Sequence, residues 1–131
     1  MNETINSSSQ IPLLTFNSLY NLLREEKTKK QLQGIDKNFY VSMNNFLTSK
    51  KDEIKTLLSH DNEKLSKEKH LLIKSKEIIT ELINLRLMKI SNIAIKNSLY
   101  GESTVSIDNI LEEEKHYYLS MVKEILKIKV K

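Results

Sequence analysis

The sequence predicts an all-α fold, a bundle of four main helices built around a long central third helix. Only two glycines and one proline occur in 131 residues, which are too few for the many tight turns of an all-β fold. The stretch from Leu71 to Leu99 contains neither residue type, so nothing in it interrupts a long helix. Elsewhere, apolar residues recur at spacings of three and four, the period of amphipathic helices.

The composition is that of a globular chain without thiol chemistry. Hydrophobic residues make up 39% and charged residues 29% of the chain, which differs from a disordered tail. Cysteine is absent, so disulfides, thiolate metal sites and cysteine nucleophiles are excluded. The start of the chain lacks the basic and apolar regions of a secretory signal. No apolar run is long enough to span a membrane, so we expect no membrane partner.

The charge balance is modestly basic, with a formal net charge of +4 and a sequence pI of about 9.2. The lysines are scattered in small clusters, whereas a dedicated nucleic-acid binder concentrates basic residues on one face and interleaves aromatic ones. We interpret most lysines as solvated helix faces and favourable helix C-termini. Any contact with DNA is expected to be weak and indirect.

The first helix is expected over Thr15–Lys27, after a flexible N-terminal segment of residues 1–12. Its apolar residues lie on one side, and a polar back faces solvent. Thr15 or Asn17 is available as the N-cap, since either side chain can accept a hydrogen bond from a free backbone N–H group.

A charged connector, Thr28–Gly34, is expected to lead into the second helix. Asp36 sits where an N-cap should, immediately before the apolar stripe of that helix begins. The stripe continues for about six turns and ends at the turn-forming cluster Ser59–Asn62. The sequence therefore predicts two helices before the central one.

The third helix is predicted to begin between Glu63 and Lys67 and to end at Tyr100. Gly101 follows directly and is placed to be its C′ residue. Over Ile78–Ile95 the apolar positions spread almost around the helix axis. A helix exposed on one side would not need this pattern, so we expect its centre to be packed by neighbours on most sides.

Two charged residues, Arg86 and Lys89, interrupt the apolar run of the third helix. A charge in such a place needs a partner or a route to water. We expect Arg86 to form a structural ion pair with Glu25 or Glu26 of the first helix, which would fix how that helix docks. The alternative is that Arg86 faces another subunit.

The fourth helix is expected to start with Ser106 or Asp108 as its N-cap, with acidic residues in its first turns opposing the helix dipole. Its apolar residues form two adjacent stripes, although one is enough to dock on a bundle. The second stripe indicates contact with another chain, and deep burial is the alternative. Together with an exposed part of the first helix, the candidate subunit interface comprises Tyr20, Ile110, Tyr117, Met121 and Ile128.

The sequence offers no set of catalytic, metal-binding or cofactor-binding residues. Three histidines are present, His60, His70 and His116, and Glu113 precedes the last at the Glu-x-x-His spacing of di-iron bundles. Such a site needs a second copy and further carboxylates, yet we expect no inward-facing Glu on the apolar faces. Two glycines cannot form a Gly-rich phosphate loop. We therefore expect neither an enzyme nor a metal or cofactor site.

Four short segments stand in a particular order along the chain. They are Leu22-Leu23-Arg24-Glu25-Glu26, Leu32-Gln33-x-Ile35-Asp36 before Phe39-Tyr40, Leu85-Arg86-Leu87-Met88-Lys89-Ile90 with Ala94, and Leu111-Glu112-Glu113-Glu114-Lys115 before Tyr117-Tyr118. Taken together, they resemble the helical A domain of the GINS family, the replication-factor subunits of archaea and eukaryotes. The third segment is similar to that family's Arg-x-x-Lys-Ile-x-x-x-Ala.

The resemblance implies a GINS-like helical A domain over residues 13–127 and a C-terminal tail or linker start over residues 128–131. Family members also carry a small β-rich B domain, and the chain resembles the class in which the helices come first. The sequence stops where the linker to a B domain would begin, so we expect either a shortened piece of a longer protein or a short family member that lacks the B domain.

The resemblance also implies a non-catalytic scaffold function in DNA replication. GINS subunits assemble as a tetramer that joins the MCM helicase and a RecJ-like protein. The expected partners are therefore other GINS subunits, in a homo- or hetero-tetramer, together with those two proteins. An archaeal member would be cytoplasmic and nucleoid-associated, and a eukaryotic one nuclear.

Two further functions fit the residues alone. A helical nucleic-acid-binding module would bind DNA with a steep dependence on salt. An unrelated four-helix adaptor would bind some other partner through the same apolar stripe.

Overall fold

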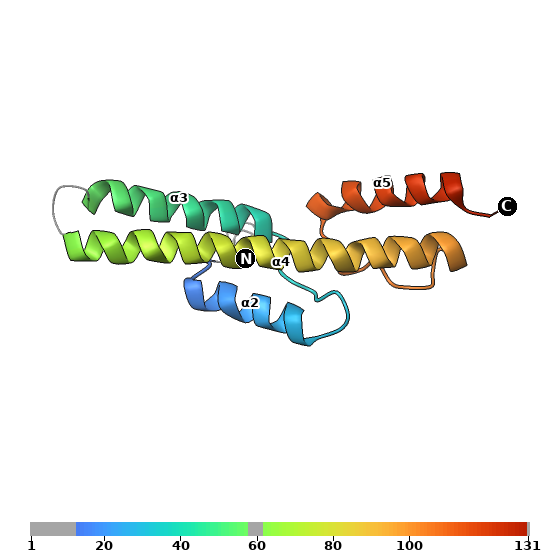
Figure 1. Ribbon diagram of the computed structural model, residues 1–131, viewed down its shortest axis with the longest axis horizontal. Coiled ribbons are helices and arrows are strands. Elements are labelled where there is room, and N and C mark those ends of the chain that lie inside the picture. Colours follow the sequence, from blue (N-terminus) through green and yellow to red (C-terminus); the bar gives the residue numbers. More distant parts are fainter. Residues whose placement is uncertain (1–12, 58–61, 131) are drawn as a thin grey trace, which may run out of the picture. The chain divides into compact units, whose positions relative to one another are not determined.

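The computed structural model describes residues 13–57 and 62–130, and this part of the chain contains helices and no strands. The helices are α2 (Phe16–Thr28), α3 (Phe39–Leu57), α4 (Asn62–Tyr100) and α5 (Glu112–Ile128) (Figure 1). The all-α prediction with a long third helix is confirmed, because α4 is the longest helix and has the most contacts with the others. The segment of residues 1–12 and most of the turn predicted at Ser59–Asn62 lie outside the described residues.

The chain divides into two compact units. The first consists of Met1–Asn21 and Asp36–Ile79, and the second of Leu22–Ile35 and Thr80–Lys131. Both α2 and α4 therefore contribute residues to each unit. None of the described helices is long and apolar enough to cross a membrane.

In the first unit, α2 begins with a reciprocal cap. The Thr15 hydroxyl accepts a hydrogen bond from the Ser18 N–H (3.1 Å), and the Ser18 hydroxyl accepts one from the Thr15 N–H (2.7 Å). This pairing satisfies two backbone donors at the helix start, as in a capping box. The prediction of Thr15 as the N-cap is confirmed, and Asn17 lies inside the helix.

Asp36, the predicted N-cap of the second helix, lies in a turn just before α3, which starts at Phe39. The Asp36 carboxylate accepts a hydrogen bond from the Asn38 N–H at 2.7 Å, and the Asp36 carbonyl accepts one from the Phe39 N–H at 3.0 Å. The side chain thus closes the turn that leads into the helix.

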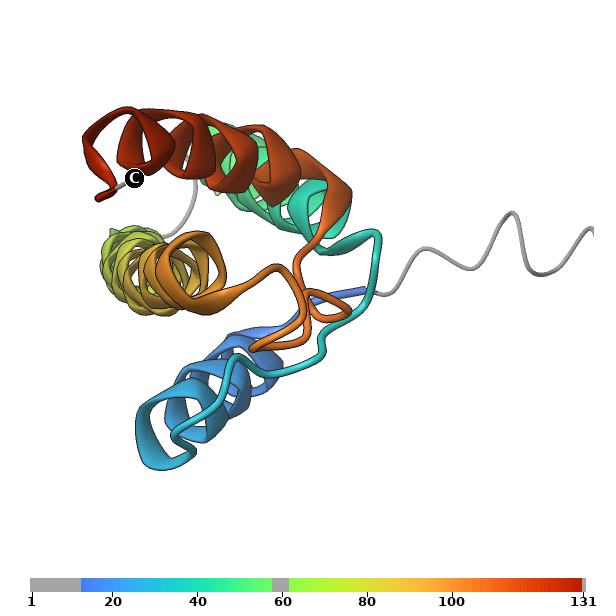
Figure 2. The same cartoon turned by 90° about the vertical axis from the view of Figure 1, so that its right-hand side faces the viewer.

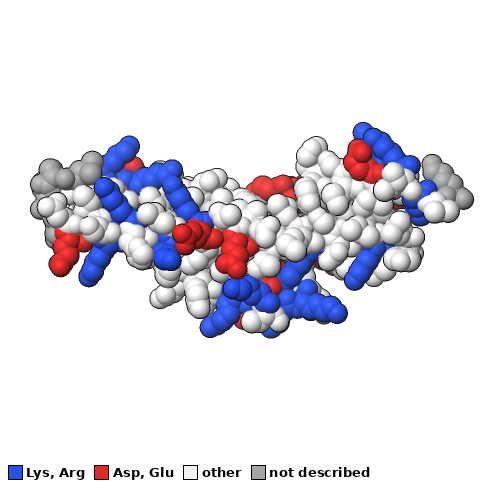
Figure 3. Space-filling model, in the orientation of Figure 1, with Lys and Arg blue, Asp and Glu red and all other residues white. Residues whose placement is uncertain are grey.

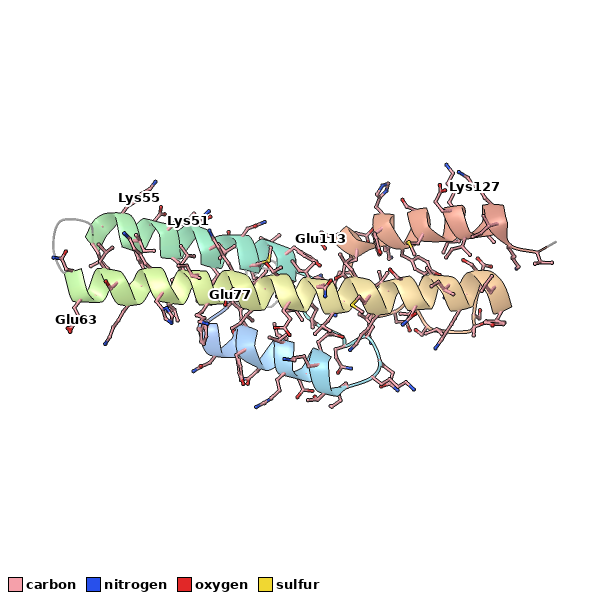
Figure 4. The ribbon with its side chains drawn as sticks, in the orientation of Figure 1. Lys51, Lys55, Glu63, Glu77, Glu113 and Lys127 are labelled. Atoms are coloured by element: carbon pink, nitrogen blue, oxygen red, sulfur yellow. The ribbon has the colours of Figure 1, made fainter. Side chains whose placement is uncertain are left out.

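Within the first unit, α3 and the first part of α4 lie side by side and run antiparallel (Figure 1). Lys50 of α3 reaches Glu68 of α4 at 3.5 Å. Lys55 points outward from α3, away from α4 (Figure 4). The large buried apolar residues of this unit are Leu19, Phe39, Phe46 and Ile79.

In the second unit, α5 runs parallel to the second part of α4, and the end of α2 lies on another side of α4 (Figure 1; Figure 2). Because α4 and α5 are parallel, the chain must return along α4 between them, and residues 101–111 make this connection (Figure 2). The buried core of the unit comprises Leu32, Ile90, Ile93, Ala94, Ile110 and Tyr118.

The end of α4 fits the predicted C′ glycine. Gly101 has φ of +121°, a backbone conformation that L side chains rarely adopt. Its N–H donates to the carbonyl of Asn97 at 3.2 Å, so one of the last free carbonyls of the helix is satisfied. The prediction for Gly101 is confirmed.

The start of α5 differs from the prediction. Neither Ser106 nor Asp108 caps it, because the Ser106 hydroxyl accepts a hydrogen bond from the Asp108 N–H in a local turn. The helix starts at Glu112, after a further turn, and Leu111 occupies the N-cap position. The Leu111 N–H donates to the Glu114 carboxylate at 2.9 Å. This is the bond from the N-cap backbone to the N3 side chain that occurs in a capping box.

The centre of α4 is less enclosed than the spread of apolar residues suggested. Met88 remains 58% exposed and Ile95 39% exposed. In the second unit the end of α2, the connector after it and α5 cover only part of the helix surface. The expectation of packing on most sides is therefore wrong for the face that carries Met88 and Ile95.

Candidate functional site

The most distinctive feature of the second unit is a buried charge cluster centred on Arg86, whose side chain is 0% exposed. Its guanidinium binds Glu114 through both carboxylate oxygens, from Nε at 2.8 Å and from Nη2 at 3.0 Å. Nη1 donates to Glu26 Oε1 at 3.1 Å and to the Gln33 carbonyl at 2.8 Å. Nη2 also donates to the Asn109 carbonyl at 2.9 Å. These contacts use all five N–H donors of the group.

Lys89, one turn further along α4, extends the cluster to the end of α2. Its Nζ lies 2.8 Å from Glu26 Oε2 and 2.6 Å from the Glu26 carbonyl. It also lies 2.9 Å from the carbonyl of Lys29 and 3.1 Å from that of Gln31. The ammonium group therefore binds one of the last carbonyls of α2 and two carbonyls that follow the helix, and it opposes the negative end of the helix dipole.

The two carboxylates of the cluster also bind backbone N–H groups. Glu26 accepts from the Gln33 N–H at 3.1 Å, which ties the connector to α2. Glu114 accepts from the Leu111 N–H, which caps α5. Two cations and two carboxylates thus balance one another, and their polar atoms bind groups from every segment of the unit.

The neighbouring charges keep Arg86 protonated. Burial alone would lower its pKa, but the hydrogen bond and charge of Glu114, followed by those of Glu26, outweigh this effect. The pKa of Arg86 therefore lies above its ordinary value.

The predicted ion pair between Arg86 and Glu26 is confirmed. The other predicted pair, Arg86 with Glu25, is wrong, because Glu25 is exposed and pairs with Lys29 at 3.1 Å instead. Sequence reasoning missed Glu114, and the expectation that the apolar faces carry no inward-facing Glu is also wrong. The available signal was its position four residues before the buried Tyr118, which places both on one helix face.

A second polar contact attaches the returning loop to two helices. The Asn97 side chain accepts from the Val105 N–H at 2.7 Å and donates to the Val105 carbonyl at 3.0 Å. It also lies 3.1 Å from the Tyr118 hydroxyl. One buried amide on α4 therefore holds both the loop and α5.

Next to the cluster lies an open cavity of about 620 Å³ within the second unit. The connector after α2, one face of α4 and the returning loop form its walls. Figure 3 shows basic side chains gathered over the end of α2 and this connector. The lining residues are Lys30, Gln31, Leu32, Lys89, Asn92, Ile93, Lys96, Thr104, Val105, Ser106 and Asn109.

The structure separates the predicted interface residues. Ile110 is 5% exposed and belongs to the core of the second unit, so its assignment to the surface is wrong. The reason is that Ile110 precedes α5, and helical spacing from Tyr117 and Met121 does not apply to it. Tyr20 is 52% exposed and Ile128 83% exposed, and their interface role stays a prediction.

Tyr117 and Met121 are half-buried and pack against the core of the second unit. The Tyr117 hydroxyl hydrogen bonds with Ser91 of α4 at 2.6 Å. Much of the second stripe of α5 is therefore occupied within the chain. Packing within the chain explains the apolar character of these two residues better than contact with another chain does.

Two exposed leucines on α5 were missed. Leu119 is 60% exposed and Leu126 45% exposed, and their seven-residue spacing places them on one face of the helix. That face differs from the one that carries the buried Tyr118. The seven-residue spacing was the available sequence signal. It was hard to see beside the two apolar stripes of the same helix, which contain more residues.

Within the described part of the chain, no group of three His, Asp or Glu side chains is placed to hold a metal ion. Glu113 and His116 of the Glu-x-x-His spacing are both exposed on α5, and Figure 4 marks Glu113 near the start of the helix. His60 lies outside the described residues. No family model, curated protein or solved structure matches this chain.

Proposed function

We propose that this chain is a non-catalytic scaffold subunit of a GINS complex in DNA replication. It would link other GINS subunits, the MCM helicase and a RecJ-like protein through helix–helix interfaces. The observation that carries the proposal is that the four GINS-like segments converge on one buried cluster. Their contributions are, in chain order, Glu26, Gln33, Arg86 with Lys89, and Glu114.

The convergence matters because the four segments lie far apart in the sequence. The hydrogen bonds from Arg86 span 60 positions to Glu26 and 28 to Glu114. Buried charges need partners in any fold, and here the partners come from all four segments. A motif whose polar residues form one closed cluster specifies how the helices pack. This supports a resemblance at the level of the domain fold.

The saturation of the cluster favours a structural role over a catalytic one. A general acid or base must exchange a proton with a group that it can reach. Here the Arg86 donors and the oxygens of Glu26 and Glu114 are occupied by one another and by backbone groups. The buried charges are therefore committed to the fold.

Exposed apolar side chains supply candidate docking surface for the scaffold. On α5 these are Leu119, Leu126 and Ile128, and on α4 they include Met88, Ile95 and Leu99. Burying such side chains against a neighbouring helix is the main favourable contribution to assembly. Tyr20 of α2 remains a candidate from the sequence.

A mixing experiment tests the proposal. The chain is combined with purified archaeal GINS subunits, MCM helicase and RecJ-like protein, and co-elution is followed with light scattering. We expect a complex that contains the chain. Leu119→Asp should weaken it by about thirtyfold or more, because a carboxylate would enter an apolar contact.

Ser120→Asp is the matched control, since it adds the same charge at the neighbouring exposed position of α5. It should leave the complex nearly intact, and both variants should melt as the wild type does. Failure to co-elute with any of these proteins would contradict the proposal. Steeply salt-dependent DNA binding in its place would favour the nucleic-acid alternative.

A further inference from the structure

We infer that the cavity of the second unit is a docking site for an acidic, extended peptide segment of a partner protein. The segment would place one aliphatic side chain in the cavity between flanking carboxylates. This inference rests on the proposed scaffold function and names the chemistry of one partner segment. Three properties of the cavity carry it.

The first property is an aliphatic lining. Leu32, Ile93 and Val105 contribute branched apolar side chains from the connector, α4 and the returning loop. The volume of about 620 Å³ is within the range of clefts that bind small ligands. An aliphatic side chain of a partner would find apolar contacts there.

The second property is an uncompensated positive charge. Among the lining residues three are lysines, and none is Asp or Glu. Lys89 is committed to the neutral charge cluster. Lys30 and Lys96 are exposed and have no ion pair within the described residues. Their charge favours a carboxylate-bearing partner, with a strength that salt would screen.

The third property is a set of polar groups that suit a peptide backbone. The Asn92 amide makes no hydrogen bond within the described residues, and the hydroxyl-bearing residues Thr104 and Ser106 also line the cavity. The Thr104 hydroxyl donates to the Gly101 carbonyl, so its lone pairs remain free to accept. An extended segment presents backbone N–H and C=O groups that need such partners.

The walls are fixed before any partner arrives. Arg86 holds the connector through the Gln33 carbonyl, and the Asn109 side chain donates to the Leu32 carbonyl at 3.0 Å. Asn97 holds the returning loop at Val105. Preformed walls lower the entropy cost of binding.

An acidic peptide fits these walls better than a nucleic acid does. No described lining residue is aromatic or arginine, whereas single strands are bound by aromatic stacking along a basic groove. Two free lysines would also neutralise few phosphates. The aliphatic lining would have no use in a contact with a phosphate backbone.

The test is an anisotropy titration of the full chain with short labelled peptides. Each probe carries acidic residues on both sides of a central Leu, Ile, Met or Phe. One control set replaces Asp and Glu by Asn and Gln, and another replaces the central residue by Ser. A labelled oligothymidine is the nucleic-acid probe.

We expect binding of at least one acidic, apolar-centred peptide and weaker binding of both of its controls. The double variant Lys30→Glu/Lys96→Glu should weaken that binding by about tenfold or more. The matched control, Lys51→Glu/Lys55→Glu, makes the same charge change at two exposed positions of α3 (Figure 4). It should change affinity by no more than about twofold.

The inference is overturned if no acidic peptide binds, if the serine-centred peptides bind equally well, or if both double variants weaken binding alike. It is also overturned if the oligothymidine is the one probe whose binding is weakened by the Lys30→Glu/Lys96→Glu change. The titration contains no replication protein. If no peptide binds, the cavity inference fails but the scaffold proposal is still tested by co-elution. If co-elution fails, the scaffold proposal fails but the titration still tests the cavity.

Discussion

Arg86 illustrates how a single side chain specifies a helical arrangement. Moving its charge and those of Lys89, Glu26 and Glu114 out of water has a large cost, which their mutual attraction and hydrogen bonds offset. The net stability gained by such a cluster is therefore small. Its main effect is specificity, since only one placement of α2, the connector and α5 satisfies all the donors and acceptors.

Removing Arg86 should be severe because Glu114 would lose its cation in a buried site and Glu26 would keep only Lys89. We expect Arg86→Ala to lower the free energy of unfolding by about 3–5 kcal/mol in urea denaturation. Arg24→Ala, at an exposed position of α2, should change it by less than about 0.5 kcal/mol. Equal effects of the two variants would contradict the structural role of Arg86.

The raised pKa of Arg86 sets the direction of its pH dependence. A group whose pKa is raised on folding contributes stability that is fully present below its unfolded pKa and is lost as pH rises through the folded one. The cluster should therefore not weaken up to about pH 9, well below the ordinary arginine value. In proton–nitrogen NMR spectra, the Arg86 Nε–H signal should persist there while that of exposed Arg24 disappears through solvent exchange. Loss of both signals together would contradict this expectation.

Gly34 and Asn109 should be coupled. A Cβ atom on Gly34 would lie 2.9 Å from Asn109 Oδ1, so Gly34→Ala should displace that amide from the Leu32 carbonyl and cost about 1 kcal/mol. In an Asn109→Ala background the same change should be neutral or stabilising by about 0.5 kcal/mol, because φ of Gly34 is not positive. A double-mutant cycle by urea denaturation measures the difference, and additive effects would disprove the coupling.

At the scale of elements, the parallel packing of α5 on α4 depends on the returning loop. Residues 101–111 must leave α4 at Gly101, run back along it and enter α5 at Glu112. Asn97 of α4 fixes both the loop and the helix that follows it, because it binds Val105 in the loop and Tyr118 in α5.

Asn97→Ala should therefore loosen the loop and α5 together. The half-buried backbone groups of Val105 and the buried Tyr118 hydroxyl would lose their hydrogen bonds, and we expect a loss of about 2–4 kcal/mol in unfolding free energy. The Val105 amide should also exchange faster with solvent in hydrogen-exchange NMR. Asn84→Ala, at an exposed position of the same helix, is the control and should change neither quantity.

The element boundaries could be predicted where the signal is local. Thr15, Asp36 and Gly101 act on backbone groups within a few residues, and their positions in the sequence were enough to identify them. The start of α5 could not be found in this way. Its cap is the Glu114 side chain acting on a residue before it, and the same carboxylate is oriented by Arg86 from another helix.

At the scale of the whole molecule, groups from distant positions determine the candidate site. Arg86 could be paired with the end of the first helix from the sequence because its charge interrupts an apolar run, but the sequence left the choice between Glu25 and Glu26 open. The cavity could not be predicted, because its walls come from three segments and two of them have no regular period. Exposed Leu119 and Leu126 were missed because a sparse stripe is hard to distinguish from single exposed residues.

The placement of charge and apolar surface also supports a scaffold at this scale. Four charged groups are withdrawn into the second unit and balanced there, whereas Lys127 points away from α4 on the outside of α5 (Figure 4). Large apolar side chains such as Met88 and Leu119 remain outside. Exposed apolar side chains of this kind are consistent with the docking surface that we propose.

Sedimentation velocity of the wild-type chain tests the central claim most directly. The chain is run alone over a range of concentrations and then with purified GINS subunits, an MCM helicase and a RecJ-like protein, the partners that we propose. The account predicts that the chain joins a heavier complex in which its apolar helix faces are covered. A chain that stays monomeric at every concentration and sediments independently of all these partners would contradict it.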